Sequence, residues 1–343
     1  MSDHMINHRG PEFFELITEC TEKLKQVFMT ENDLFILTSS GTGALEASIV
    51  NTLSPGDKVL AASAGSFGDR YADLLDAYGA EVTRITFEWG EPIDPDGIRQ
   101  GLKDDPEIKA VIVTHNETST GVTHDLQSIA SVVKGEFGKL LLVDAVSSLG
   151  CVPLPVDGWD CDVVSTGSQK GFMIPPGLAF ISFGRDAWEA QKEAAMPRFY
   201  FDLEEAKKYL DRGQTPWTPN LSAMYGLRAA LENIMDEGME GVFGRHASIG
   251  QFTRDGVRAM GLELLCADEA RASNTVTAVK MPIHIDGEQM MEIMRTEENV
   301  VLAGGQGKLT GHIFRIGIWA TLNEEHIQEV LDALGRVLPR VGF

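Results

Sequence analysis

The chain has 343 residues, which is long enough for two domains. Its content of 43% hydrophobic and 23% charged residues is that of a globular protein that folds in water. A formal net charge of −22 argues against a nucleic-acid partner, because such a surface repels a phosphate backbone. No apolar run approaches a membrane span, and residues 1–5 lack the basic and apolar stretches of a secretory signal. We therefore expect a cytoplasmic protein with no membrane partner.

The first half of the chain alternates between predicted strands and helices. Apolar or β-branched runs predict seven strands, at 34–37, 58–62, 81–87, 109–114, 139–143, 162–166 and 178–183. Helical segments lie between several of them, for example at 67–78 and 125–134. This alternation predicts an α/β fold whose mostly parallel, seven-stranded sheet is covered by helices on both faces. Ligands of such sheets bind beyond the C-terminal ends of the strands, so the residues after each run are the candidates for a site.

The second half has a different pattern. Three long helices are predicted at 202–210, 221–235 and 241–260. They are followed by a strand at 275–280, a helix at 287–295, strands around 300–302 and at 312–318, and a helix at 323–338. This pattern predicts a smaller α+β domain at the C-terminus. We place the domains at 1–240 and 241–343, and we expect residues 1–15 to pack on the small domain or on a partner subunit.

Small residues follow the first predicted strand at 38–43 and lead into a strongly helical segment at 44–47. Backbone N–H groups at such a helix start can approach an anion, and the helix dipole favours negative charge there. The segment matches neither of the two common nucleotide-binding glycine patterns, so we expect a phosphate cup that does not bind a nucleotide. An ordinary strand-to-helix turn is the alternative.

Side chains that follow two further predicted strands are candidates for a site at the C-terminal edge of the sheet. Phe67 follows the second strand and could lie on a flat cofactor ring, or it could pack in the core. The dense polar cluster at 115–121 follows the fourth strand, and its His115 could be either a site residue or a hydrogen-bonded core histidine.

The most informative pair is Asp144 and Lys170. Asp144 ends an apolar run, and Lys170 follows the next predicted strand after small polar residues. The two side chains should therefore extend from neighbouring strand tips. This pair is what pyridoxal phosphate (PLP) chemistry needs, because a lysine forms a Schiff base with the aldehyde and a carboxylate keeps the pyridine nitrogen protonated. A PLP site is therefore one hypothesis for this pair, and the alternatives are a solvated lysine and an aspartate that forms a turn.

The four cysteines show no Cys-x-x-Cys spacing and no metal-ligand spacing. We expect reduced, mostly buried thiols and no metal site.

In combination, these motifs resemble the class V PLP-dependent aminotransferases, and most closely the serine–pyruvate / alanine–glyoxylate aminotransferase group. The resemblance covers nearly the whole chain and is specific because the motifs occur together and in order. They are the segments 5–13, 40–46, 114–121, 143–150, 165–170, 175–177 and 314–317. The family has the PLP-dependent transferase fold of type I, and the resemblance implies that fold here.

The resemblance also implies the residues of the cofactor site. Three of them bind the phosphate, two pack on the pyridine ring, and the rest lie at its substituents and nitrogen. The phosphate turn is Ser40, Gly41 and Thr42, and the ring contacts are Phe67 and Val146. Thr118 lies near the 3-oxygen, and Gln169 neighbours the phosphate or the 3-oxygen. The nitrogen partner is Asp144, and the residue that carries the cofactor is Lys170.

Two more residues follow from the resemblance. Thr218 matches a residue that reaches the phosphate from the partner subunit, which implies a homodimer with shared sites. Arg315 matches the arginine that binds the substrate carboxylate, a task for which a planar guanidinium is well suited. An internal salt bridge is the alternative for Arg315, since its apolar strand would otherwise bury an unpaired charge.

The expected reaction is transfer of an amino group between a small amino acid, alanine or serine, and a small 2-oxo acid, glyoxylate or pyruvate. No second basic side chain is apparent for a distal carboxylate. One alternative is a lyase of the cysteine desulfurase type, but its candidate nucleophile Cys266 lies in an apolar run. The other is a weakly active PLP-binding homologue. Family members usually carry a pocket-lining N-terminal loop ahead of residue 5, and Thr215 stands where some have a tyrosine from the partner subunit.

Overall fold

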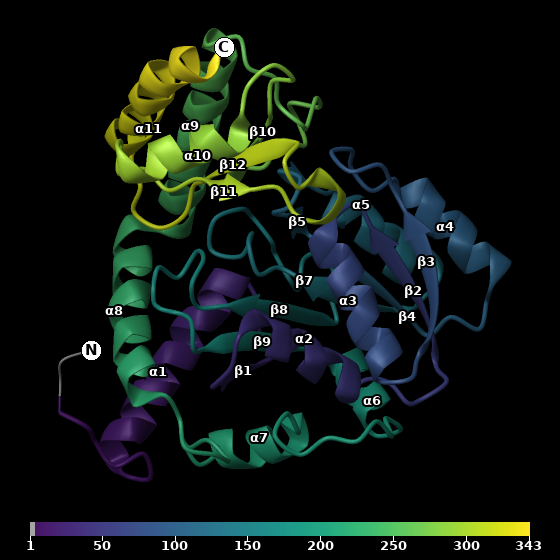
Figure 1. The fold of residues 1–343 in the computed structure, drawn as a ribbon. Coiled ribbons are helices and arrows are strands. Elements are labelled where there is room, and N and C mark those ends of the chain that lie inside the picture. The colour runs from purple at the N-terminus through teal and green to yellow at the C-terminus, as the bar shows by residue number, and fades with distance from the viewer. Residues whose placement is uncertain (1–3) are drawn as a thin grey trace.

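A computed structural model describes residues 4–343 (Figure 1). Its main sheet has the strand order β1-β9-β8-β7-β4-β2-β3. Every neighbouring pair from β3 to β8 is parallel, and β9 runs antiparallel to both of its neighbours. The strands are β1 (Asp33–Leu37), β2 (Lys58–Ser63), β3 (Glu81–Thr86), β4 (Ala110–Thr114), β7 (Leu140–Asp144), β8 (Val163–Gly167) and β9 (Ala179–Phe183). The predicted mostly parallel, seven-stranded sheet is confirmed.

Helices cover both faces of this sheet because both faces are apolar. Successive strand residues point to opposite sides, so Val111 and Val113 of β4 join one core cluster whereas Ile112 joins the other. On the first face lie α1 (Pro11–Phe28), α4 (Pro95–Asp104), α5 (Leu126–Ala130) and α8 (Leu221–Glu237). On the second face lie α2 (Gly41–Val50), α3 (Ser66–Ala77), α6 (Arg185–Gln191) and α7 (Leu203–Leu210).

The N-terminal segment packs on the main sheet. The helix α1, which the sequence analysis missed, buries an apolar stripe with helical spacing that includes Phe13, Leu16 and Ile17. Just before it, an Arg9 Nη1–H donates to the carbonyl of Thr215 at 2.7 Å. The described part of this segment therefore contacts the main body, and residues 1–3 lie outside the described residues. Packing of residues 1–15 on the small domain or on a partner subunit stays a prediction.

The C-terminal part forms a second, smaller body (Figure 1). Its antiparallel sheet has the order β10-β12-β11, and its core cluster is separate from those of the main sheet. Its strands and helices are α9 (Met239–Ala259), β10 (Val276–Lys280), α10 (Gly287–Thr296), β11 (Ala303–Gly304), β12 (Ile313–Gly317) and α11 (Glu324–Val337). We propose a domain boundary near residue 240, where α9 begins.

One predicted strand of this body is displaced. The apolar run at 300–302 predicted a strand, but the strand is β11, at Ala303–Gly304. Asn299 has a left-handed backbone (φ 56°), and Val301 after it is 79% exposed. The chain thus turns before it reaches the edge of β12, and only the two residues after the apolar run pair with that strand.

Among residues 4–343, no helix is long and apolar enough to cross a lipid bilayer.

Candidate functional site

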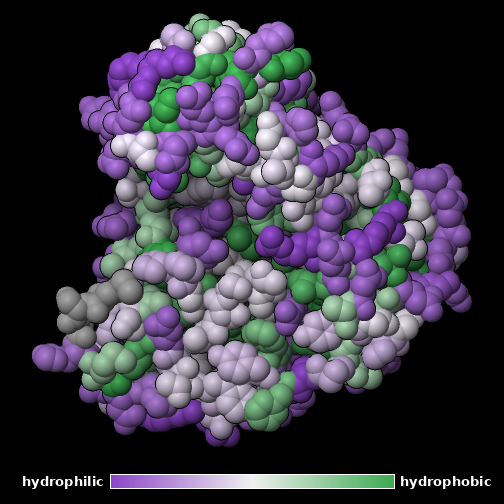
Figure 2. Space-filling model, viewed as in Figure 1, coloured by the Kyte–Doolittle hydropathy of each residue, from purple (hydrophilic) through white to green (hydrophobic). Residues whose placement is uncertain are grey.

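The C-terminal ends of β4, β7 and β8 meet at one edge of the main sheet. Asp144 is the last residue of β7, and its Cα is in register with Thr114 of β4 and Ser165 of β8. The turn after β8 carries Lys170. The small body stands over this edge in Figure 1, and the surface in Figure 2 is hollowed where the two bodies meet. The strand-tip placement predicted from the sequence is thus present.

Asp144 is a buried carboxyl group with few hydrogen bonds or charges nearby to offset the loss of water. It is 4% exposed, and its Oδ1 accepts one hydrogen bond, from the backbone N–H of Val146 at 2.9 Å. The pKa of Asp144 is raised to about 7, chiefly by burial and also by the nearby Glu117, whereas the hydrogen bond from Val146 and the charges of Arg70 and Lys170 oppose the rise. No cation lies within salt-bridge distance among the described residues. A protonated pyridine nitrogen would supply the missing positive partner.

Lys170 also lacks an ionic partner. Among residues 4–343 no carboxylate lies within 4.0 Å of its amine, and no hydrogen bond from Nζ is formed. Burial lowers the pKa of Lys170, and the charge of Arg315 lowers it further. A lower pKa increases the share of neutral amine, which is the form that attacks a carbonyl carbon. The electrostatics therefore suit Lys170 to bond formation with an aldehyde.

Arg315 lies on β12 of the small body and points at the same site. It is 8% exposed, its Nε–H donates to the carbonyl of Gly304 at 3.0 Å, and an Nη1–H donates to the carbonyl of Thr118 at 2.9 Å. In the described chain Arg315 forms no salt bridge, so the alternative of an internal ion pair is wrong. A buried guanidinium whose partners are all neutral is a ready site for an anion.

The start of α2 forms the predicted cup. Ser40 is the N-cap but makes no side-chain cap bond, and the N–H groups of Gly41 and Thr42 find no acceptor in the described chain. Glycine is required here, because a Cβ on Gly41 would lie 2.6 Å from Val146 Cγ2. Across the cup, a Cβ on Gly167 would lie 3.3 Å from the Gly41 nitrogen. Free N–H groups at a helix N-terminus in such a close-packed turn suit a phosphate.

A buried carboxylate that the sequence analysis did not select fixes two of the candidates. Glu117 accepts the backbone N–H groups of Phe67 at 3.2 Å and Gly68 at 3.0 Å, and that of Ser119 at 3.0 Å. It thereby holds the N-terminus of α3, which carries Phe67, and the turn that carries Thr118. Its signal in the sequence was an acidic residue three positions after the end of an apolar strand, inside the polar cluster at 115–121.

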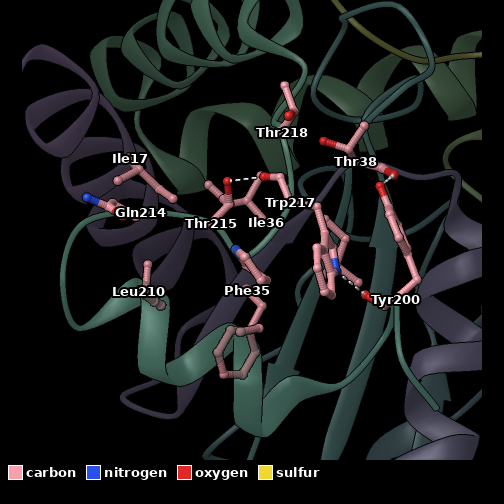
Figure 3. A pocket seen from close by; sticks show the side chains of 13 residues that line it. Ile17, Phe35, Ile36, Thr38, Tyr200, Leu210, Gln214, Thr215, Trp217 and Thr218 are labelled. Atoms are coloured by element: carbon pink, nitrogen blue, oxygen red, sulfur yellow. Dashed lines mark hydrogen bonds between the residues drawn. The ribbon is translucent and has the colours of Figure 1, made fainter. Parts of the chain in front are cut away.

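The three remaining sequence candidates, Gln169, His115 and Thr218, lie at the rim of the cup, in the core and at a small cavity, respectively. Gln169 is exposed at the rim of the cup, with its Oε1 2.9 Å from where a Cβ on Gly167 would stand. His115 is a core residue: its Nδ1 lies 3.0 Å from Ser148 Oγ, and burial lowers its pKa to about 4. Thr218 is exposed and lines a small cavity of about 40 Å³ that Figure 3 shows.

The comparisons with known proteins identify the family. The profile of the "Aminotransferase class-V" family matches residues 2–330. This chain belongs to the class-V aminotransferases. It is 44% identical, over its whole length and 89% of the relative's, to a protein of Synechococcus sp. named "Soluble hydrogenase, small subunit". It is 38% identical to the serine–glyoxylate aminotransferase of Methylorubrum extorquens, over 93% of this chain and 81% of the relative's.

A solved structure agrees with this membership. The crystal structure of alanine–glyoxylate aminotransferase from Nostoc sp. superposes with a TM-score of 0.94 and 32% identity, covering 98% of this chain and 90% of that one. The fold of this aminotransferase is that of the PLP-dependent family, and its cofactor is PLP.

The residues present fit that cofactor. The site offers a buried carboxyl group, a half-buried amine and a helix N-terminus with free N–H groups, and none of these is neutralised by residues 4–343. They correspond to the pyridinium nitrogen, the aldehyde and the phosphate of PLP. Among the described residues, no cluster of side chains could hold a metal ion.

The cysteines of this aminotransferase do not favour desulfurase chemistry. All four are free and buried, as expected from their spacing. Burial raises the pKa of Cys266 to about 11, and its thiol donates to the carbonyl of Asp268 at 3.4 Å. A thiol that stays protonated at neutral pH is a poor nucleophile.

The raised pKa of Asp144 predicts a pH-dependent effect on stability. In cofactor-free protein the folded state must ionise this carboxyl group at a higher pH than the unfolded chain does, so the group destabilises the fold progressively as pH rises from about 4 to about 7. Asp144→Asn should therefore stabilise the cofactor-free protein, and the gain should grow by about 2–3 kcal/mol between pH 5 and pH 8. Urea unfolding at the two pH values measures it.

The exposed Asp236→Asn is the matched control and should show no such growth. A gain for Asp144→Asn that is equal at both pH values would contradict the assignment of a buried, uncompensated carboxyl group.

Proposed function

We propose that this aminotransferase moves an amino group between a small α-amino acid, such as alanine or serine, and a small 2-oxo acid, glyoxylate or pyruvate. The observation that carries the proposal is the buried guanidinium of Arg315. It has no anionic partner among residues 4–343 and lies close enough to Lys170 for its charge to lower the pKa of that amine. An anion site beside a nucleophilic amine suits the α-carboxylate and α-amino group of one amino acid. The relatives named as serine–glyoxylate and alanine–glyoxylate aminotransferases support the substrates.

The site residues then have distinct tasks. The N-terminus of α2, at Ser40, Gly41 and Thr42, binds the phosphate, with Gln169 at its rim. Phe67 and Val146 contact the two faces of the ring, and Thr118 lies near its 3-oxygen. Asp144 supplies the carboxylate for the ring nitrogen. The bound cofactor withdraws electrons from the substrate Cα, which makes the Cα proton acidic.

Two residues act on the substrate itself. Arg315 binds the substrate carboxylate through its fork of N–H groups and so fixes the direction of the Cα–H bond. Lys170 Nζ, once its amine is free, accepts the Cα proton as a general base. Its lowered pKa suits this task, because the neutral amine is present at a lower pH than in an ordinary lysine.

We also propose a homodimer, with a shared site to which Thr218 contributes from the partner subunit. Next to Thr218 lies an aromatic patch, which we define as Phe199, Tyr200 and Trp217 (Figure 3 labels the last two). Trp217 stacks on Phe199 with ring centroids 4.7 Å apart, and Phe199 is 75% exposed. Exposed, mutually stacked aromatic rings are typical of a surface that another protein covers. The free, buried cysteines suit a reducing compartment, which supports the expected cytoplasmic location.

The reaction itself is the first test. With PLP, alanine or serine and glyoxylate, the purified protein should produce glycine and the 2-oxo acid of the donor, measured by chromatography. Lys170→Ala should abolish this reaction, and the exposed control Lys192→Ala should leave it unchanged. Sulfide release from cysteine would instead identify a desulfurase. Tight PLP binding without amino transfer to any 2-oxo acid would identify the weakly active homologue.

Arg315→Ala should weaken the reaction of every α-amino acid by a similar factor. The loss in kcat/KM should correspond to about 2–5 kcal/mol, as for removal of one partner from a desolvated charge pair. PLP binding should remain, and primary amines without a carboxylate should react as before. The exposed Arg295→Ala is the control. Equal losses for amines and amino acids would mean that Arg315 only supports the fold.

Phe199→Asp should dissociate the dimer, because it places a charge in the aromatic patch. Sedimentation should show a shift to monomers, and PLP affinity should fall by about tenfold or more if Thr218 of the partner completes the phosphate site. Phe343→Asp replaces another exposed aromatic residue and should change neither property. A monomer that binds PLP with wild-type affinity would contradict the shared site.

A further inference from the structure

Trp319 is a site residue that the sequence analysis did not select. It follows β12 on the small body, and its indole face lies under the Lys170 amine, with Nζ 3.8 Å from the ring centroid. Its Nε1–H points at the carbonyl of Ser147 at 3.4 Å, in the turn after β7. One side chain of the small body thus contacts two turns of the main sheet's C-terminal edge, the one after β7 and the one after β8.

The indole is held in place by its neighbours. A Cβ on Gly317 would lie 2.5 Å from Trp319 Cζ3, so the ring occupies space that only glycine leaves free. Ala320, the next residue, has a left-handed backbone (φ 69°), which costs energy for a residue other than glycine and persists only where the surroundings impose it. An Arg245 Nη1–H donates to the carbonyl of Ala320 at 2.6 Å. Arg245 is in turn held by Glu237 through two hydrogen bonds, at 2.7 Å and 2.9 Å.

The indole ring can stabilise the charged form of the Lys170 amine. Its amine is repelled by Arg315 and has no carboxylate partner in the described chain, so any charged amine in the site lacks compensation. The face of an indole ring is the most favourable aromatic partner for an ammonium, and the attraction grows when water is excluded. Aromatic stabilisation differs from an ion pair in one useful respect: a neutral amine leaves the ring face at little cost, whereas a carboxylate would keep the amine charged and bound.

We propose that Trp319 is a positioning residue for Lys170. Its ring face holds the amine over the site whenever the amine is free, and it releases the amine for bond formation. The inference rests on the proposed function, since a free lysine amine occurs in each turnover of that reaction. Because Trp319 belongs to the small body, the amine is held only when the two bodies are in contact.

The first experiment uses cofactor-free protein and does not depend on transamination. A double-mutant cycle with Trp319→Leu and Lys170→Met, followed by urea unfolding, measures the direct interaction between the two side chains. The two changes should be non-additive by about tenfold or more in the unfolding equilibrium constant. The matched control is the exposed Lys308, whose Nζ lies 4.9 Å from the ring centroid of the half-buried Trp89, and the coupling of this pair should be smaller. Additive effects at Trp319 and Lys170 would overturn the proposal.

The second experiment uses the PLP-loaded enzyme. Trp319→Leu should lower kcat by about tenfold or more while KM for the amino acid stays within about twofold. The kinetic isotope effect from deuterium on the substrate Cα should rise, because removal of the Cα proton by a less well-placed amine becomes slower. Trp319→Phe keeps a ring face and should restore most of kcat.

Gly317→Ala provides a second route if Trp319→Leu fails to fold. The added methyl group must displace the indole, so this variant should reproduce the loss of kcat with Trp319 still present.

A rise in KM at unchanged kcat would show that Trp319 only lines the substrate pocket. Equal losses for Trp319→Phe and Trp319→Leu would show that the ring face is not used. Either result would overturn the proposal, and failure of the wild-type enzyme to transaminate would instead refute the proposed function.

Discussion

The site depends on three ionisable groups, two buried and one half-buried, that do not neutralise one another. Asp144 and Arg315 are buried and Lys170 is half-buried, and none has an oppositely charged partner within 4.0 Å in the described chain. Burying charge in this way costs free energy that the chain alone does not recover. The cost is recovered when a ligand brings the complementary groups, and PLP together with an amino acid brings a pyridinium nitrogen, an aldehyde and a carboxylate. In this account, the same unpaired charges that destabilise the empty protein select its cofactor and its substrate.

The rest of the structure brings Asp144, Lys170 and Arg315 to one site without letting them form ion pairs. The parallel strands place Asp144 and the Lys170 turn at one edge of the main sheet, and the antiparallel β12 brings Arg315 from the small body. Glu117 fixes α3 and the Thr118 turn by accepting backbone N–H groups, and Thr118 accepts from Arg315. The two bodies thus meet through hydrogen bonds to backbone carbonyls, which position a guanidinium without cancelling its charge.

Much of this could be predicted from the sequence, because the strongest signals were local. Apolar runs located the strands of the main sheet, and Asp144 and Lys170 stood at strand ends, where α/β sheets bind ligands. The misses came from long-range effects. Helix α1 was not seen, and the packing of Trp319 under Lys170 joins positions 149 apart in the chain, which no local pattern reports. The strand at 300–302 was misplaced because backbone geometry at Asn299, and not apolar character, decides where pairing begins.

The most direct test of the account is to locate the cofactor on the chain. Borohydride reduction of the purified protein after PLP is added, followed by proteolysis and mass mapping, should place one pyridoxyl group on the peptide that contains Lys170. Asp144→Asn should bind PLP less tightly and still be labelled at the same residue, because the carboxyl group contacts the ring nitrogen and not the aldehyde. A protein that takes up no PLP, or whose label is spread over exposed lysines such as Lys192, would contradict the claim that Asp144, Lys170 and Arg315 form a site for the cofactor and its substrate.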